Sequence, residues 1–106
     1  MNKLYGMLGL AKKAGKISTG AFICSKMIKS QRARLVIIAR DASDGTKKSI
    51  GDSCRYYKIK LIEVGDMSEL GRMTGGGDRA VVSVNDNNFA KAISDIYSMC
   101  CETEKG

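Results

Sequence analysis

The chain has 106 residues, of which 43% are hydrophobic and 27% charged, and this composition fits one compact domain rather than a disordered segment. Its 18 lysines and arginines outnumber its 11 aspartates and glutamates, and the resulting net charge of +7 favours a polyanionic partner. No stretch approaches the ~18–20 continuous apolar residues of a membrane span, so we expect no membrane association and no signal peptide.

Helices and short apolar segments alternate along the chain. The hydrophobic periodicity predicts five helices, over residues 2–14, 20–30, 45–57, 68–73 and 87–101. It predicts four strands, over residues 16–18, 34–39, 60–64 and 80–84. This order predicts an α/β protein, a three-layer α/β/α sandwich with a central four-stranded mixed sheet. We expect residues 1–101 to form the single domain and residues 102–106 to be a frayed tail.

The chain lacks the residues of the common catalytic and metal sites. Histidine is absent, which excludes Ser–His and Cys–His pairs within the chain. The four cysteines form no C-x-x-C pair, so we expect reduced thiols in a cytoplasmic protein rather than a zinc site or a disulfide framework. The glycines of residues 75–77 lack the lysine of a phosphate loop and predict a turn. We therefore predict no catalytic residue, no metal site and no cofactor.

The positive charge is concentrated in the first 40 residues. This segment has no acidic residue, whereas residues 41–84 balance the two signs and residues 85–106 are slightly acidic. Like charges at helical spacing repel one another, so an unmixed run favours a polyanion site over an ordinary solvated surface. The nine basic residues are Lys3, Lys12, Lys13, Lys16, Lys26, Lys29, Arg32, Arg34 and Arg40.

The predicted helix over residues 20–30 has the most informative surface. Its core stripe is expected to contain Ile23, Cys24, Met27 and Ile28. The opposite face then presents Phe22, Lys26 and Lys29, and an aromatic ring among lysines suits base stacking flanked by phosphate contacts. The alternative is that Phe22 packs beneath a neighbouring loop near Leu70.

The beginning of the same helix is a second candidate contact. Gly20 permits close backbone approach, and the free N–H groups of the first turn favour a phosphate or a base acceptor. Lys16, Ser18 and Thr19 precede this glycine, and we expect them to supply further donors at the same end.

Two of the arginines have ordinary structural alternatives. Arg32 and Arg34 flank the start of the central strand, and Arg32 could pair with Asp52. Arg79 lies at a strand entry and could form a structural ion pair. Arg40 follows the end of the central strand, and a six-residue strand spans ~20 Å, so Arg32, Arg34 and Arg40 cannot all share one patch with Lys26.

Several short motifs follow one another at characteristic spacing between about residues 4 and 95. They are Gly15-Lys16-Ile17-Ser18-Thr19-Gly20, Lys26, residues 33–39, Glu69-Leu70-Gly71, the glycine turn and residues 79–82. As an ordered set they resemble the ribosomal protein L-seven-Ae superfamily, and within it the small bacterial YlxQ-type ribosomal-protein paralogues.

The resemblance implies a three-layer α/β/α protein that binds structured RNA, typically kink-turns, which are sharp bends built around tandem sheared G·A pairs. It implies contacts from Gly20 at the helix start, from Lys26 on that helix and from Lys16 in the approach segment. It also implies that a loop lies over extruded bases, formed by Gly65, Asp66, Met67 and Ser68.

The chain departs from the family pattern at two positions. Strong kink-turn binders carry Asn and Glu at the second and third positions after the glycine, where this chain has Phe22 and Ile23. We expect Phe22 to replace hydrogen bonding by stacking, which gives a looser sequence preference.

We therefore predict a monomeric, non-enzymatic cytoplasmic protein that binds structured RNA, ribosomal or other kink-turn RNA, with ribosomal proteins as further candidate partners. The chief alternative is a protein–protein adaptor domain of the same fold with no direct RNA role. An enzyme that uses a carboxylate base is a weaker third interpretation.

Overall fold

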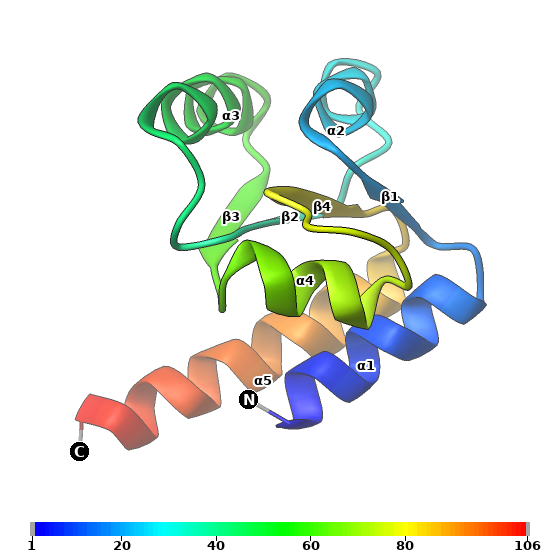
Figure 1. The fold of residues 1–106 in the computed structure, drawn as a ribbon, viewed down its shortest axis with the longest axis vertical. Helices are drawn as coiled ribbons and strands as arrows, with labels where there is room; N and C mark the ends of the chain where they lie inside the picture. The colour runs from blue at the N-terminus through cyan, green and yellow to red at the C-terminus, as the bar shows by residue number, and fades with distance from the viewer. Residues whose placement is uncertain (1, 106) are drawn as a thin grey trace.

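A computed structural model describes residues 2–105, and side-chain burial for residues 3–99. Helices and strands alternate along the chain (Figure 1). The helices are α1 (Asn2–Lys13), α2 (Ala21–Lys29), α3 (Asp44–Tyr57), α4 (Met67–Met73) and α5 (Asn87–Lys105). The strands are β1 (Ile17–Thr19), β2 (Leu35–Ile38), β3 (Lys60–Glu63) and β4 (Val81–Val84).

The predicted elements are all present, and one boundary differs substantially. Helix α5 continues to Lys105, beyond the predicted end at Cys101. The sequence after Cys101 contains glutamate and lysine, which are good helix formers, and no glycine or proline before Gly106.

The four strands form one mixed sheet in the order β1-β4-β2-β3. Strand β4 runs antiparallel to both of its neighbours, whereas β2 and β3 are parallel. Strands β1, β2 and β3 therefore point in the same direction, and their carboxyl ends meet the start of β4. We call this the carboxyl end of the sheet, and the opposite side, where β1, β2 and β3 begin, the amino end.

Helices cover both faces of the sheet and produce three layers (Figure 1). Helices α2 and α3 pack on one face through the buried side chains of Cys24, Ile28, Ile50 and Cys54. Helices α1, α4 and α5 pack on the other face through Leu4, Leu8, Leu70, Ala90 and Ile93. The predicted α/β/α sandwich around a four-stranded mixed sheet is confirmed.

Strand β2 is buried at every position, as its continuous apolar sequence predicts. Its side chains alternate between the two cores, because successive residues of a strand point to opposite faces. The central strand thus holds both helix layers in place, and the loops at its ends are correspondingly fixed. Within residues 2–105, no helix is long and apolar enough to cross a membrane.

Candidate nucleic-acid interface

Four loops meet at the carboxyl end of the sheet. The backbone N–H of Gly20 donates to Val81 O at 3.0 Å, and that of Ala39 donates to Ala80 O at 2.8 Å. These bonds place the start of α2, the loop after β2 and the loop before β4 side by side. The loop after β3 joins them, because Arg40 N donates to Gly65 O at 2.9 Å.

The start of α2 is open to a ligand. Gly20 has a φ of 93°, a conformation that side-chain-bearing residues rarely adopt, and it provides no side-chain cap for the helix. A Cβ built on Gly20 would meet nothing within 4 Å, so the space in front of this turn is free. The first-turn N–H groups therefore remain available for an anion or a base acceptor, as the sequence predicted.

Phe22 and Lys26 form one exposed pair on α2. The Phe22 side chain is 72% exposed, so the alternative that it packs beneath a loop near Leu70 is wrong. The ammonium of Lys26 lies 4.6 Å from the centroid of the Phe22 ring, in a cation–π contact. A flat apolar surface and a positive charge are thereby held together within the first two turns after the open helix start.

Ile23 does not belong to the core, which corrects the predicted core stripe of this helix. It is 50% exposed, whereas Cys24 and Ile28 are fully buried. A helix of only nine residues that packs on a flat sheet buries a narrow stripe, and Ile23 lies outside it. Phe22 and Ile23, which stand at the two positions that differ from the family pattern, are therefore both at the surface.

The segment from Gly65 to Ser68 lies at the carboxyl end, and several of its polar groups bond within the protein. Asp66 caps α4, since its carboxylate accepts from Glu69 N at 2.8 Å. The Glu69 carboxylate in turn accepts from Asp66 N at 3.2 Å. Met67 N donates to the Asp41 carboxylate at 2.8 Å, and Met67 packs against the core. The exposed side chain of Ser68 is left to face a ligand.

The hydroxyl of Tyr5 holds the same segment from the α1 side. A Cβ on Gly65, whose φ is 63°, would collide with this hydroxyl. Partial burial and the neighbouring Glu69 carboxylate raise the pKa of Tyr5, so the phenol stays protonated. The loop after β3 is thus clamped between α1 and the cap of α4.

Of the other predicted contact residues, only Thr19 is next to Gly20. Lys16 precedes β1 at the amino end, where its carbonyl accepts from Asn85 N at 2.8 Å. The intervening strand separates it from Gly20 by ~13 Å at about 3.3 Å per residue. The Ser18 hydroxyl accepts from the Asn85 amide at 3.0 Å within the sheet. Thr19 directly precedes Gly20, and Lys29 lies at the far end of α2.

Two arginines complete the carboxyl end, and the sequence did not single them out for this site. Arg40 is exposed in the loop after β2, next to Gly65. Arg79 precedes β4, and its backbone N–H donates to Met67 O at 3.0 Å. The signal that could have found them is their position, since each flanks a buried strand at the end where α2 begins.

The predicted ion-pair alternatives for the arginines are not observed. Asp52 pairs with Arg55 at 3.3 Å and not with Arg32. Among the described residues, Arg79 takes part in no ion pair, and its Nε is buried without a hydrogen-bond partner. Its guanidinium lies against Gly76, where a Cβ would come within 2.5 Å of Nη2. The glycine turn therefore bends closely around a cation with an unused donor.

The buried thiols have no part in this surface. Burial raises the pKa of both Cys24 and Cys54 to about 11, which leaves them protonated at neutral pH. They lie between the sheet and helices α2 and α3. Within the described residues, no three side chains of cysteine, aspartate or glutamate are grouped so that they could hold a metal ion.

Comparison with known proteins identifies the family. The profile of the Ribosomal protein L7Ae/L30e/S12e/Gadd45 family matches residues 2–94, which is most of the chain. The chain belongs to this family. The resemblance drawn from the motifs is therefore confirmed, and it extends over both helix layers and all four strands.

Individual relatives agree with this assignment. The chain is 39% identical to a Bacillus subtilis protein named RNA-binding protein YlxQ over 84% of this chain and 89% of that protein. It is 35% identical to the protein of the same name from Enterococcus faecium over 89% of this chain and 90% of that one.

Two solved structures share the fold. A Bacillus halodurans protein described as having unknown function superposes with a TM-score of 0.85 at 34% identity, covering 88% of this chain and 94% of its own. The Giardia lamblia 15.5kD RNA binding protein superposes with a TM-score of 0.77, covering 91% of this chain and 82% of its own. Its identity of 22% supports the fold alone.

Proposed function

We propose that this chain binds structured RNA at the carboxyl end of its sheet, with the start of α2 at the centre of the contact. The observation that carries this proposal is the uncapped glycine turn beside the exposed Phe22–Lys26 pair. Free N–H groups, a stacking ring and a cation are the three kinds of group with which proteins hold unpaired nucleotides. The relatives named RNA-binding protein YlxQ support the same ligand class.

The remaining contacts follow from the loops that surround this turn. Arg40, Arg79 and Ser68 lie at the same end of the sheet and can reach phosphate or sugar groups. Thr19 lies next to the turn, whereas Lys29 extends the contact along α2. Asp66 and Met67 act as positioning residues, because their polar groups already bond within the protein. Lys16 and Ser18 would be reached only by an RNA that also crosses β1.

The RNA we propose is a kink-turn or a similar bend with unpaired nucleotides, in ribosomal or other non-coding RNA. The exposed positions of Phe22 and Ile23 indicate how such a bend would be read. Neither side chain can hydrogen-bond to a base edge, so shape and stacking would replace the direct reading of G·A pairs. We therefore expect a preference for bent RNA with modest sequence dependence.

The test is a gel shift with a kink-turn stem-loop and the full chain. A competitor in which the sheared G·A pairs are replaced by Watson–Crick pairs should compete less well than the unlabelled kink-turn. Equal competition by the two RNAs would remove the kink-turn preference but keep RNA binding. No shift by either RNA up to high micromolar protein would contradict the proposed function.

The proposal is a binding function without a chemical step, in agreement with the family. An adaptor role is the second candidate, because Phe22 and Ile23 form adjacent exposed apolar side chains that an acidic protein partner could cover. The two roles differ in salt dependence: RNA binding should weaken steeply as salt rises, whereas an apolar protein contact should not.

A further inference from the structure

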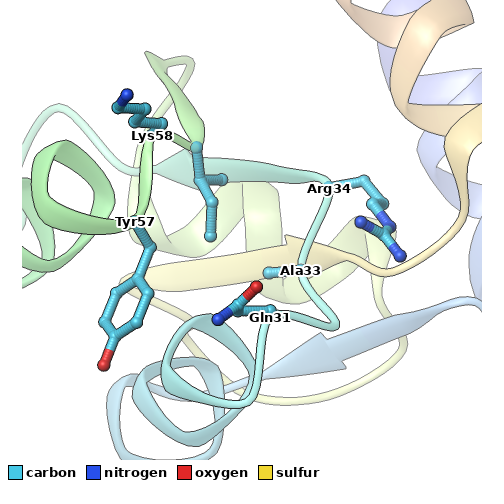
Figure 2. A pocket seen from close by; sticks show the side chains of 6 residues that line it. Gln31, Ala33, Arg34, Tyr57 and Lys58 are labelled. Carbon is cyan, nitrogen blue, oxygen red and sulfur yellow. The ribbon is translucent and has the colours of Figure 1, made fainter.

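A small pocket lies at the amino end of the sheet, on the opposite side of the molecule from the open start of α2. It is formed where α2 and α3 end and where β2 and β3 begin, and its volume is about 170 Å³. Ligand pockets for cofactors and drug-sized molecules usually measure ~300–1,000 Å³, so this one suits a single ring or a small polar group. Its lining residues are Gln31, Ala33, Arg34, Tyr57, Lys58 and Ile59 (Figure 2).

The backbone that frames the pocket is held in an unusual conformation. Gln31 and Lys58 are the non-glycine residues of the described chain with positive φ, at 62° and 59°, and both line this pocket. The left-handed conformation is unfavourable for a residue that bears a side chain. Helices α2 and α3 thus both turn sharply at their carboxyl ends, and the two turns face each other across the pocket.

The side chains of the pocket combine three chemistries. Tyr57 supplies an aromatic ring, which packs partly against the core between the sheet and helices α2 and α3 and lies 4.8 Å from the Tyr56 ring, centroid to centroid, in a T-shaped arrangement. Gln31 supplies an amide that can donate to and accept from a base edge. Arg34 and Lys58 are exposed cations, and none of the ion pairs in the described part of the chain involves either of them.

No carboxylate lines the pocket, so its charge is purely positive. Arg32, Lys29 and Lys60 lie in the neighbouring segments and increase the positive potential at this end. The carbonyl dipoles at the ends of α2 and α3 point toward the same region and favour hydrogen-bond donors over anions inside it. A ligand with a donor-bearing ring and an attached phosphate would match both features, with the ring inside and the phosphate on the exposed cations.

We propose that this pocket receives one unstacked nucleotide from a single-stranded segment of RNA. The base would stack on Tyr57 and bond to Gln31, while Arg34 and Lys58 would hold the adjacent phosphates. The inference extends the proposed RNA binding to a second site, and it rests on that function because one RNA would reach both. Helix α2, at about 13 Å for nine residues, spans the distance between the two sites.

The experiment uses the full chain and two separate probes, a blunt-ended kink-turn stem-loop and an oligouridine of about ten nucleotides. We expect Arg34→Ala and Tyr57→Leu each to weaken oligouridine binding about fivefold or more, and to leave kink-turn affinity nearly unchanged. Arg34→Ala should also reduce the salt slope of log K for the oligouridine by about 0.7. Phe22→Ala should show the opposite selectivity between the two probes.

Lys91→Ala is the matched control, since it removes one exposed cation from α5 in the other helix layer. Tyr57→Leu retains an apolar side chain of similar bulk, and a thermal melt shows whether this variant is folded. Arg34 is exposed, so Arg34→Ala tests the site without a risk of unfolding the protein. Unchanged oligouridine affinity in Arg34→Ala and in folded Tyr57→Leu would overturn the proposal, as would failure of the wild-type chain to bind oligouridine. If the kink-turn does not bind but oligouridine binding depends on Arg34 and Tyr57, the proposed function fails and this site remains.

Discussion

Phe22 is a large apolar side chain that lies exposed on the surface of the protein. Its ring is 72% exposed on the first turn of α2, beside an open helix start. Replacement by alanine should weaken RNA binding by about 1–3 kcal/mol, because base–aromatic stacking contributes that much per base. A fluorescence titration with the kink-turn stem-loop measures the change.

Tyr56→Ala is the control for Phe22, because that ring is 79% exposed on α3 and lies outside the proposed contact. It should leave the affinity within experimental error. If Phe22→Ala has equally little effect, the ring does not stack on a base and the role of the α2 surface must rest on its charge alone.

Lys26 tests whether this surface contacts phosphate. Lys26→Ala should reduce the slope of log K against log salt by about one unit, because one fewer phosphate is neutralised. Titrations at several salt concentrations give the slope. A large loss of affinity at constant slope would instead indicate that Lys26, which lies over the Phe22 ring, contacts a base. One series of titrations distinguishes the two outcomes.

At the residue scale, the sequence predicted which side chains are exposed on α2 better than it predicted their partners. The helical spacing placed Phe22 and Lys26 together on the outer face, where the structure has them. It did not identify the carboxylate of Asp66 as the α4 cap, although Asp66 and Glu69 have the spacing of a capping box. The prediction placed Ile23 in the core because the side chain is apolar, although its position is at the margin of the buried stripe.

At the scale of the element, the short helix α4 depends on its amino-terminal cap. Asp66→Ala should reduce the free energy of unfolding by about 0.5–2 kcal/mol, since it removes the carboxylate that accepts from Glu69 N and leaves only the bond from the backbone N–H of residue 66 to Glu69. Urea denaturation followed by circular dichroism measures this loss. Ser68→Ala, on the exposed side of the same helix, should change the stability by less than about 0.5 kcal/mol.

Leu70 of α4 is fully buried. An unchanged free energy of unfolding in Asp66→Ala would mean that the packing of Leu70 alone holds α4 in place. The same variant is informative for RNA binding. If the loop after β3 only positions Ser68, Asp66→Ala should lower the affinity for RNA because the loop becomes less ordered. The loss would then not come from a missing contact between Asp66 and RNA.

The elements themselves were predictable because each carries a local signal. Apolar runs mark β2 and β4, helical periodicity marks α1 and α5, and glycines mark the turns. Their arrangement relative to one another was less accessible. Lys16 and Gly20 are four residues apart and were expected to act together, yet the extended strand between them sends them to opposite ends of the sheet.

At the scale of the whole molecule, the sandwich protects two thiols. Cys24 and Cys54 lie between the sheet and the α2–α3 layer, and burial raises the pKa of each to about 11 from an ordinary value of 9.0. We expect iodoacetamide to modify neither residue in the folded chain at pH 8, and both in urea. Peptide mass spectrometry resolves the individual sites.

The same shifts give the stability a defined pH dependence. A thiol whose pKa is higher in the folded than in the unfolded state contributes stability that is complete below about pH 9 and is lost as the pH rises toward 11. Denaturation midpoints should therefore decline across this window.

In the alkylation experiment, rapid modification of Cys24 at pH 8 would show that the α2 layer opens without global unfolding.

The glycine at the head of α2 has a thermodynamic consequence for the complete protein. A serine or aspartate there would be strained at a φ of 93°, and its side chain would occupy the amides that an incoming anion needs. The free protein thus begins this helix without a side-chain acceptor, and in the complex that we propose the RNA supplies it. Hydrogen exchange at the amides of Ala21, Phe22 and Ile23 should consequently slow when RNA arrives, making the nucleic acid part of the secondary structure that recognises it.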